Sequence, residues 1–226
     1  MKHIYIVVEG QSEEKFVQNI LVPYFAYKNI FLTAEPVITG RSTKGKYCKG
    51  GGNSYKLYKN HIERLIKQFS NAKNYYFTTM IDLYALPTDF PKLDESKVHS
   101  DKYKLVQFLE SSFNEDISAR NFIPYIQLHE FETLMFHNLE KIADEFFDIN
   151  VNLKEFQKEI NKYDNLELIN SSPSKAPSKR IDKYTNGQYC TRKVSASANI
   201  LKDIDVDLLR DKYTHFNQWL QKIEDI

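Results

Sequence analysis

Carboxylate residues follow three of the apolar segments that the sequence predicts as strands. Glu9 ends the first such segment, Asp82 ends another, and Glu130 and Glu132 come just after a third. In an open parallel sheet the carboxyl ends of the strands share one edge, where ligands bind. Acids gathered there need compensating positive charge, which a hard cation such as Mg²⁺ or Mn²⁺ supplies through oxygen ligands. The sequence therefore predicts a metal site formed by Glu9, Asp82 and Glu130.

Each of these acids also has an ordinary structural interpretation. Glu9 can favour the positive end of a helix dipole, and Asp82 can sit in a turn. Glu130 and Glu132 can be first-turn acids of a helix. Residues two apart share a face only on an extended segment. We therefore expect one of this last pair to be a ligand, with Glu130 favoured, and the other to assist.

His129 stands directly before Glu130, which invites comparison with a zinc protease motif. That motif needs a second His four residues later, and position 133 is Thr. His129 remains a candidate to orient a carboxylate or to shuttle a proton, and a half-buried structural His is the alternative. The chain contains neither a Walker A sequence nor a GxGxxG motif. P-loop nucleotide hydrolysis is therefore not expected.

Basic residues concentrate in two segments, although the formal net charge of the chain is only +1. In the first segment, Lys46 and Lys49 precede a run of glycines and a predicted helix, an arrangement that can cradle a phosphate. In the second, Lys179 and Arg180 follow a proline, and Arg can hold a phosphate bidentately. These four residues are the predicted phosphate or nucleic-acid contacts, and two solvated lysine-rich loops are the alternative.

Predicted strands alternate with predicted helices along the first part of the chain. Strands are expected at residues 3–8, 31–38, 75–81 and 122–128, and helices at 12–24, 53–69, 102–113 and from 129 onward. This order predicts an α/β fold with a mostly parallel sheet and helices on both faces. Pro124 makes the last strand an edge or an irregular strand. We expect residues 1–138 to form the α/β domain, and residues 139–226 to form a mainly helical extension packed on it.

Composition sets the class and the compartment that we expect. Hydrophobic residues make up 42% of the chain and charged residues 27%, as in globular proteins. No apolar run approaches the roughly 18 residues of a membrane span, and the first residues do not form a secretory signal. The only cysteines, Cys48 and Cys190, have no CxxC spacing, which favours a reducing compartment. We therefore expect a cytoplasmic protein with no membrane contact.

The acid-bearing segments resemble the Toprim fold of topoisomerases, primases and OLD-type nucleases. The segment IVVEGQSEEKF puts Glu9 at the position of the Toprim glutamate, and TTMIDLY puts Asp82 at the first acid of the Asp-x-Asp motif. The second acid of that motif is replaced by Tyr84. The whole chain resembles a bacterial Toprim-like family, often encoded beside an ATPase, through VEGQSEEKF, MIDLYALPTDFP, IPYIQLHEFETLMF and APSKRI.

This resemblance implies a phosphodiesterase that uses Mg²⁺ or Mn²⁺ on nucleic acid, in a defence or DNA-repair system with an ATPase partner. Glu9 would act as general base or ligand, Asp82 as ligand, and Lys179 and Arg180 would hold the scissile phosphate. The alternative is a non-catalytic partner or regulatory module of an ATPase. With Tyr84 at the second acid position, the sequence leaves open whether one or two metals bind. It also leaves open whether the substrate is DNA, RNA or a small nucleotide, and whether the protein forms a homodimer.

Overall fold

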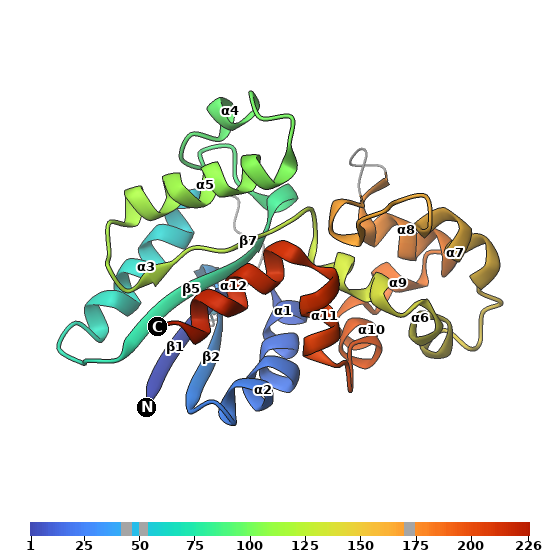
Figure 1. Cartoon of the computed structure of the whole chain (residues 1–226), viewed down its shortest axis with the longest axis horizontal. Helices are drawn as coiled ribbons and strands as arrows, with labels where there is room; N and C mark the ends of the chain where they lie inside the picture. The colour runs from blue at the N-terminus through green and yellow to red at the C-terminus, as the bar shows by residue number, and fades with distance from the viewer. Residues whose placement is uncertain (42–46, 50–53, 170–174) are drawn as a thin grey trace.

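A parallel sheet forms the centre of the molecule. The computed structural model describes residues 1–41, 47–49, 54–169 and 175–226 (Figure 1). The sheet has the order β2-β1-β5, and β6 and β7 pair in turn with the outer side of β5. Every pair in it is parallel. The strands are β1 (Lys2–Val8), β2 (Ile30–Pro36), β5 (Tyr75–Asp82), β6 (Phe122–Ile123) and β7 (Ile126–Gln127). The predicted α/β fold with a parallel sheet is confirmed.

Helices cover both faces of this sheet, because β1 is apolar on both. Its Ile4, Ile6 and Val8 enter one hydrophobic core, and Val7 enters the other. The first core includes residues of α1 (Gln11–Phe16), η1 (Val17–Leu21), α2 (Val22–Ala26) and α12 (Thr214–Glu224). The second includes residues of α3 (Tyr55–Gln68) and α5 (Lys102–Ile117). Figure 1 shows α3 and α5 on one side of the sheet and α1 and α2 on the other.

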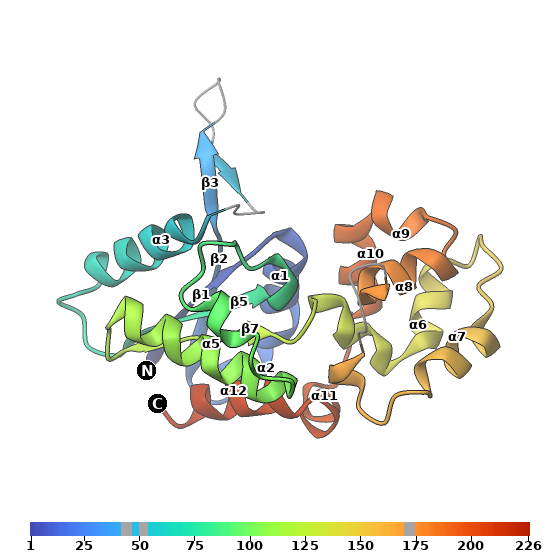
Figure 2. The ribbon, with the colours of Figure 1, turned by 90° about the horizontal axis from the view of Figure 1, so that it is seen from above.

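The second half of the chain adds a helical layer beyond one end of the sheet (Figure 2). A 3₁₀ segment, η3 (Phe131–His137), leads from β7 into this layer. Its helices are α6 (Leu139–Glu145), α7 (Leu153–Ile160), α8 (Pro177–Tyr184), α9 (Gln188–Thr191), α10 (Lys193–Ile200) and α11 (Val206–Lys212). Shorter elements elsewhere are β3 (Ile38–Arg41), β4 (Tyr47–Lys49), η2 (Leu83–Ala85), α4 (Leu93–Ser96) and η4 (Leu166–Leu168). Among the described helices, none combines the length and apolar character that crossing a bilayer requires.

Pro124 interrupts the outer strand, as predicted, and a threonine side chain bridges the gap. Thr79 Oγ1 donates to the backbone oxygen of Tyr125 at 2.8 Å and accepts from its backbone nitrogen at 2.9 Å. The next backbone nitrogen, that of Ile126, donates to Glu110 Oε1 at 2.9 Å. These side chains replace ladder bonds that the broken strand cannot make, so buried backbone groups there stay paired.

One local expectation needs correction. The segment after β7 does not begin a regular helix, because Glu130 is still extended (φ −143°, ψ 153°) and η3 follows it as a 3₁₀ segment. The start of α3 is not capped by the side chain of Ser54. Instead, Asp89 accepts from the backbone nitrogen of Tyr55 at 2.8 Å.

The C-terminal helix α12 returns from the helical layer to the sheet. Trp219 is buried and donates from Nε1 to Thr78 Oγ1 at 2.9 Å. Its ring stacks on that of Tyr125, with 4.2 Å between the centroids. Helix α12 therefore completes the core on one face of the sheet. The division of the chain into two domains at residue 138 stays a prediction.

Candidate functional site

Carboxyl groups from five residues meet at the carboxyl edge of the sheet. The charge of at least one other of these acids raises the pKa of Glu9, of Glu13, of Asp82 and of Glu130. Glu9 follows β1, Asp82 ends β5, Glu130 follows β7, Glu132 lies on η3, and Glu13 lies on α1. We call these five residues the acid cluster. The four acids predicted from the sequence are thus brought together, and Glu13 joins them.

Backbone contacts hold the central acids in place. The backbone nitrogen of Asp82 donates to Glu9 Oε2 at 3.4 Å, which ties the end of β1 to the end of β5. The backbone nitrogen of Phe131 donates to Asp82 Oδ1 at 2.8 Å. Asp82 therefore accepts the first N–H of η3 and fixes the segment that carries Glu130 and Glu132.

One lysine supplies the nearby positive charge. Lys193, at the start of α10, places Nζ 2.6 Å from Glu132 Oε1, which also accepts from the hydroxyl of Tyr189 at 3.0 Å. Glu132 is completely buried, and its Oε2 has no hydrogen-bond partner among the described residues. A buried carboxylate oxygen without a hydrogen-bond partner costs free energy of folding. A ligand that binds this atom would offset that cost.

Burial and mutual repulsion raise the pKa values of four acids of the cluster, namely Glu9, Glu13, Asp82 and Glu130. Burial raises the pKa of Glu13 to about 7, and the charges of Glu132 and Glu9 add to the rise. Burial, followed by the charges of neighbouring acids, also raises the pKa values of Glu9, Asp82 and Glu130. The ammonium of Lys193 alone does not offset this much negative charge.

The pKa of Lys193 is shifted by the same acids. Burial by itself lowers this pKa, but the charge and hydrogen bond of Glu132, with the charges of Asp82 and Glu13, raise it above its ordinary value. Lys193 therefore stays protonated throughout the neutral range. It is a fixed cation facing an edge that holds several acids.

The N-terminus of α8 contacts the acid cluster directly. The backbone nitrogen of Ser178 donates to Glu130 Oε2 at 2.9 Å. Glu130 thus accepts one of the N–H groups that the first turn of a helix leaves unpaired. This contact fixes the basic helix α8 beside the acids.

His129 lies beside the acid cluster without pairing to it. It is completely buried, has a left-handed backbone (φ 63°), and neither ring nitrogen has a hydrogen-bond partner among the described residues. Burial, with the charge of Lys102, lowers its pKa to about 4, so the ring is neutral. Its centroid is 5.3 Å from that of Tyr84. Orientation of a carboxylate or transfer of a proton by His129 stays a prediction.

The predicted phosphate contacts have different fates. Arg180 is buried, and its guanidinium contacts Glu159, the hydroxyl of Tyr163 and a backbone oxygen. The structure thus gives Arg180 an internal role in place of the phosphate contact that the sequence suggested. Lys179 is exposed on α8. Lys46 lies outside the described residues, and for Lys49 only its backbone in β4 is described.

The donor set fits a hard cation in chemistry and charge. Its oxygens belong to carboxyl groups, burial together with the charges of neighbouring acids raises the pKa values of Glu9 and Asp82, and Glu132 Oε2 has no hydrogen-bond partner among the described residues. In the described part of the chain, however, no three His, Cys, Asp or Glu side chains already stand where they could hold one metal ion together. Binding would therefore require the acid side chains to converge on the cation.

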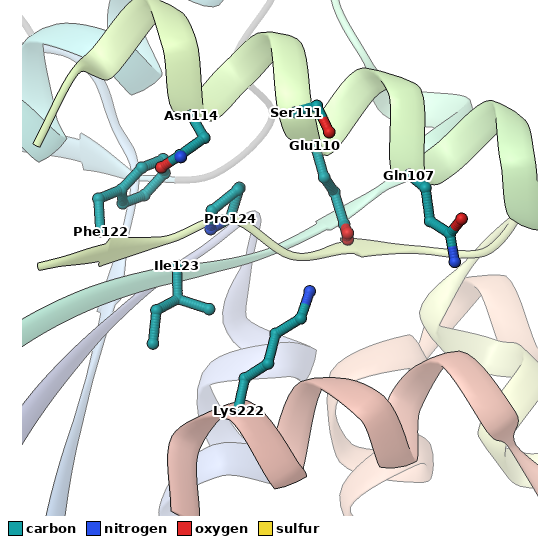
Figure 3. A pocket seen from close by; sticks show the side chains of 8 residues that line it. All are labelled: Gln107, Glu110, Ser111, Asn114, Phe122, Ile123, Pro124 and Lys222. Carbon is teal, nitrogen blue, oxygen red and sulfur yellow. The ribbon is translucent and has the colours of Figure 1, made fainter. Parts of the chain in front are cut away.

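A separate pocket between α5 and α12 is not the candidate site (Figure 3). It has a volume of about 270 Å³ and is lined by none of the acid cluster. Glu110 points into it from α5 and Lys222 from α12. Glu110 already accepts from the backbone nitrogen of Ile126 and pairs with His215 at 2.9 Å. Its carboxylate is therefore a structural group.

Sequence reasoning missed three residues of the site. Glu13 lies four residues after Glu9, the spacing that returns to one side of a turn, and this was a usable signal. Lys193 was visible as part of a basic segment but without a role. Tyr189 was one of 15 tyrosines in the chain. Nothing in the local sequence links these last two to acids about sixty residues earlier.

Comparison with known proteins gives a family and two structural neighbours. No curated protein matches the chain. Two solved structures of the C-terminal region of the Xanthomonas campestris pv. campestris OLD protein are similar to it, each at 13% sequence identity and a TM-score of 0.47. The first covers 99% of this chain and 93% of that one, and the second 98% and 94%. The profile of the family described as "Domain of unknown function (DUF4276)" matches residues 8–224, so the chain belongs to the DUF4276 family.

Proposed function

We propose that this protein is a phosphodiesterase that cleaves nucleic acid at the acid cluster with the help of Mg²⁺ or Mn²⁺. The observation that carries the proposal is the convergence of five carboxyl groups on one sheet edge, where Lys193, 2.6 Å from Glu132, supplies the nearby positive charge. Such a convergence of acids suits a divalent cation. The resemblance of the segments around Glu9 and Asp82 to Toprim motifs supports the same chemistry.

Glu9, Asp82 and Glu132 are the residues that we expect to hold the cation. Glu132 takes precedence over Glu130 because its Oε2 has no hydrogen-bond partner in the described part of the chain, whereas Glu130 Oε2 already accepts from the backbone of α8. When bound, the cation would lower the pKa of a coordinated water and neutralise charge on the phosphate. Replacement of the second Toprim acid by Tyr84 makes a single cation the simpler arrangement.

Glu13 and Lys193 provide the chain's own chemistry beside that cation. The pKa of Glu13, about 7, allows its carboxyl group to give up or accept a proton near neutral pH. Lys193 keeps its positive charge and lies 2.6 Å from Glu132, so it can stabilise negative charge that develops on the phosphate. In this proposal Glu13 is the proton-transfer group, and Lys193 is the electrostatic one.

A cleavage assay tests the proposal. Labelled single-stranded and duplex DNA and RNA are incubated with the protein and Mg²⁺, Mn²⁺ or Ca²⁺ in turn. We expect cleavage with Mg²⁺ and Mn²⁺ but not with Ca²⁺, because Ca²⁺ takes more, loosely arranged ligands and a misplacement of about 1 Å can cost about a hundredfold in rate. The Glu9→Gln protein should be inactive. Cleavage in excess chelator, or by Glu9→Gln at the native rate, would overturn the proposal.

A second candidate is a non-catalytic module that acts with an ATPase. The pair between Lys193 and Glu132 favours it, because a lysine that neutralises an acid can replace a metal. The lack of a preformed three-ligand group within the described ranges points the same way. Absence of cleavage with every metal, both alone and with an ATPase of the kind often encoded beside members of the resembled family, would favour this candidate.

A further inference from the structure

A concave basic surface lies between α7 and α8, apart from the acid cluster. It is a pocket of about 480 Å³, and its wall carries four exposed lysines, Lys162, Lys175, Lys179 and Lys183. We call it the basic pocket. Figure 2 shows α7 and α8 in the helical layer beyond the sheet.

The floor of the basic pocket is a rigid network around Arg180. Its Nε donates to the backbone oxygen of Lys175 at 2.8 Å, and an Nη donates to the hydroxyl of Tyr163 at 2.7 Å. The other Nη is paired with Glu159, which also binds Lys183 at 2.9 Å. The buried guanidinium therefore shapes the pocket and leaves the outer lysines to meet a ligand.

The basic pocket holds more positive charge than it neutralises. Five cationic side chains line it against one carboxylate, that of Glu159. Arg180 and Lys183 already share this carboxylate. Lys162, Lys175 and Lys179 form no ion pair with any described residue. Like charges held around a concavity create a local potential that attracts a polyanion.

Its position relates the basic pocket to the acid cluster. Ser178, at the start of α8, donates to Glu130 of the cluster, and Lys179 is the next residue. Lys183 follows one helical turn later, about 6 Å further along the axis. A phosphate chain that follows α8 over these lysines would therefore lead to the acids.

We propose that the basic pocket binds the phosphate backbone of the nucleic-acid strand on one side of the bond to be cleaved. This inference rests on the proposed function for its direction, since the acids define where the strand must lead. The ligand is a run of phosphates, and the lysines recognise it by charge, without reading the bases. Arg180 is a positioning residue that holds the floor in shape.

Binding without cleavage tests this inference. Anisotropy of a labelled 15-nucleotide single strand, DNA or RNA, is measured in chelator at 50 and 200 mM salt. We expect Lys175→Ala/Lys179→Ala to bind about tenfold more weakly at low salt, with the slope of log affinity against log salt reduced by about 1.4, roughly 0.7 for each lost contact. The control, Lys154→Ala/Lys158→Ala, removes two exposed lysines from α7 outside the pocket. It should change affinity less than twofold.

The outcomes separate this inference from the proposed function. Equal affinities of the two double variants would overturn the inference that the basic pocket binds the strand, even if the native protein cleaves nucleic acid. Binding that depends on the pocket lysines, with no cleavage under any metal, would support strand binding by the basic pocket and overturn the proposed phosphodiesterase activity. Competition by inorganic phosphate or AMP as strong as that of the unlabelled strand, at equal phosphate concentration, would show a small-anion site and overturn the strand assignment.

Discussion

Glu13 is an acid of the cluster whose protonation changes near neutral pH. Its pKa, about 7 in the folded protein, lies above the ordinary value of 4.5, so the folded state binds this proton more tightly than the unfolded state does. Its contribution to stability is therefore greatest when the group is protonated and is lost as the pH rises from about 4.5 through about 7.

A comparison with Glu13→Gln measures this effect. Gln stays neutral at every pH, so the native protein should lose roughly 3 kcal/mol of unfolding free energy relative to the variant between pH 4.5 and pH 8. Urea denaturation in chelator at several pH values gives both curves. Parallel curves would show that the Glu13 carboxyl group is not held protonated by its surroundings.

Lys193 is the second residue whose replacement should change the stability of the protein. Lys193→Met should lower the free energy of unfolding by about 3 kcal/mol at pH 8, because it leaves Glu132 buried without its counter-charge. Lys202→Met, which removes an exposed lysine, should change stability by less than about 0.5 kcal/mol. Equal effects of both substitutions in thermal or urea denaturation would contradict the assigned contact.

Helix α8 shows how two adjacent basic residues take different roles. The helix buries Arg180, Ile181 and Tyr184, which sets Arg180 inward and Lys179 outward. Arg180→Ala should therefore lower stability by about 3 kcal/mol, since it removes the partner of Glu159 and of the Tyr163 hydroxyl. Lys179→Ala should be neutral to within about 0.5 kcal/mol. Denaturation curves that rank the two variants in the opposite order would show that the helix is rotated.

Periodicity and turn chemistry explain why most elements could be predicted. The apolar run of β1 and the aromatic, β-branched run of β5 matched strands within a residue or two. Pro124 correctly signalled the irregular outer strand. The 3₁₀ segment η3 could not be predicted, because its start depends on the bond from Phe131 to Asp82, a contact between distant residues.

The same distinction between local and distant contacts applies to the site. Parallel strands end at one edge, so the meeting of Glu9, Asp82 and Glu130 followed from the order of strands. Lys193 reaches the acids only because the helical layer folds back toward β1, and contact with Glu132 spans about sixty residues. No local pattern encodes such a contact. The charge state of the site was therefore the part least accessible from the sequence.

At the scale of the whole molecule, the last helix completes the core that the first strand begins. Trp219 of α12 stacks on Tyr125 and bonds to Thr78 of β5. Trp219→Ala should cost about 4 kcal/mol, and a fragment ending at residue 138 should fail to fold, because one face of its sheet would lose this cover. Circular dichroism and urea unfolding of the two proteins check this. A cooperatively folded fragment would show that residues 1–138 are an independent domain.

The central claim is that the acid cluster gathers its charge in order to hold a divalent cation. Calorimetric titration of the native protein with Mn²⁺ near pH 8, above the pKa of about 7 of Glu13, tests it most directly. We expect saturable binding in the native protein and none in Glu9→Gln or Asp82→Asn, with both variants still folded and at least as stable as the native protein without metal. No Mn²⁺ binding to the native protein, or undiminished binding in both variants, would contradict the claim.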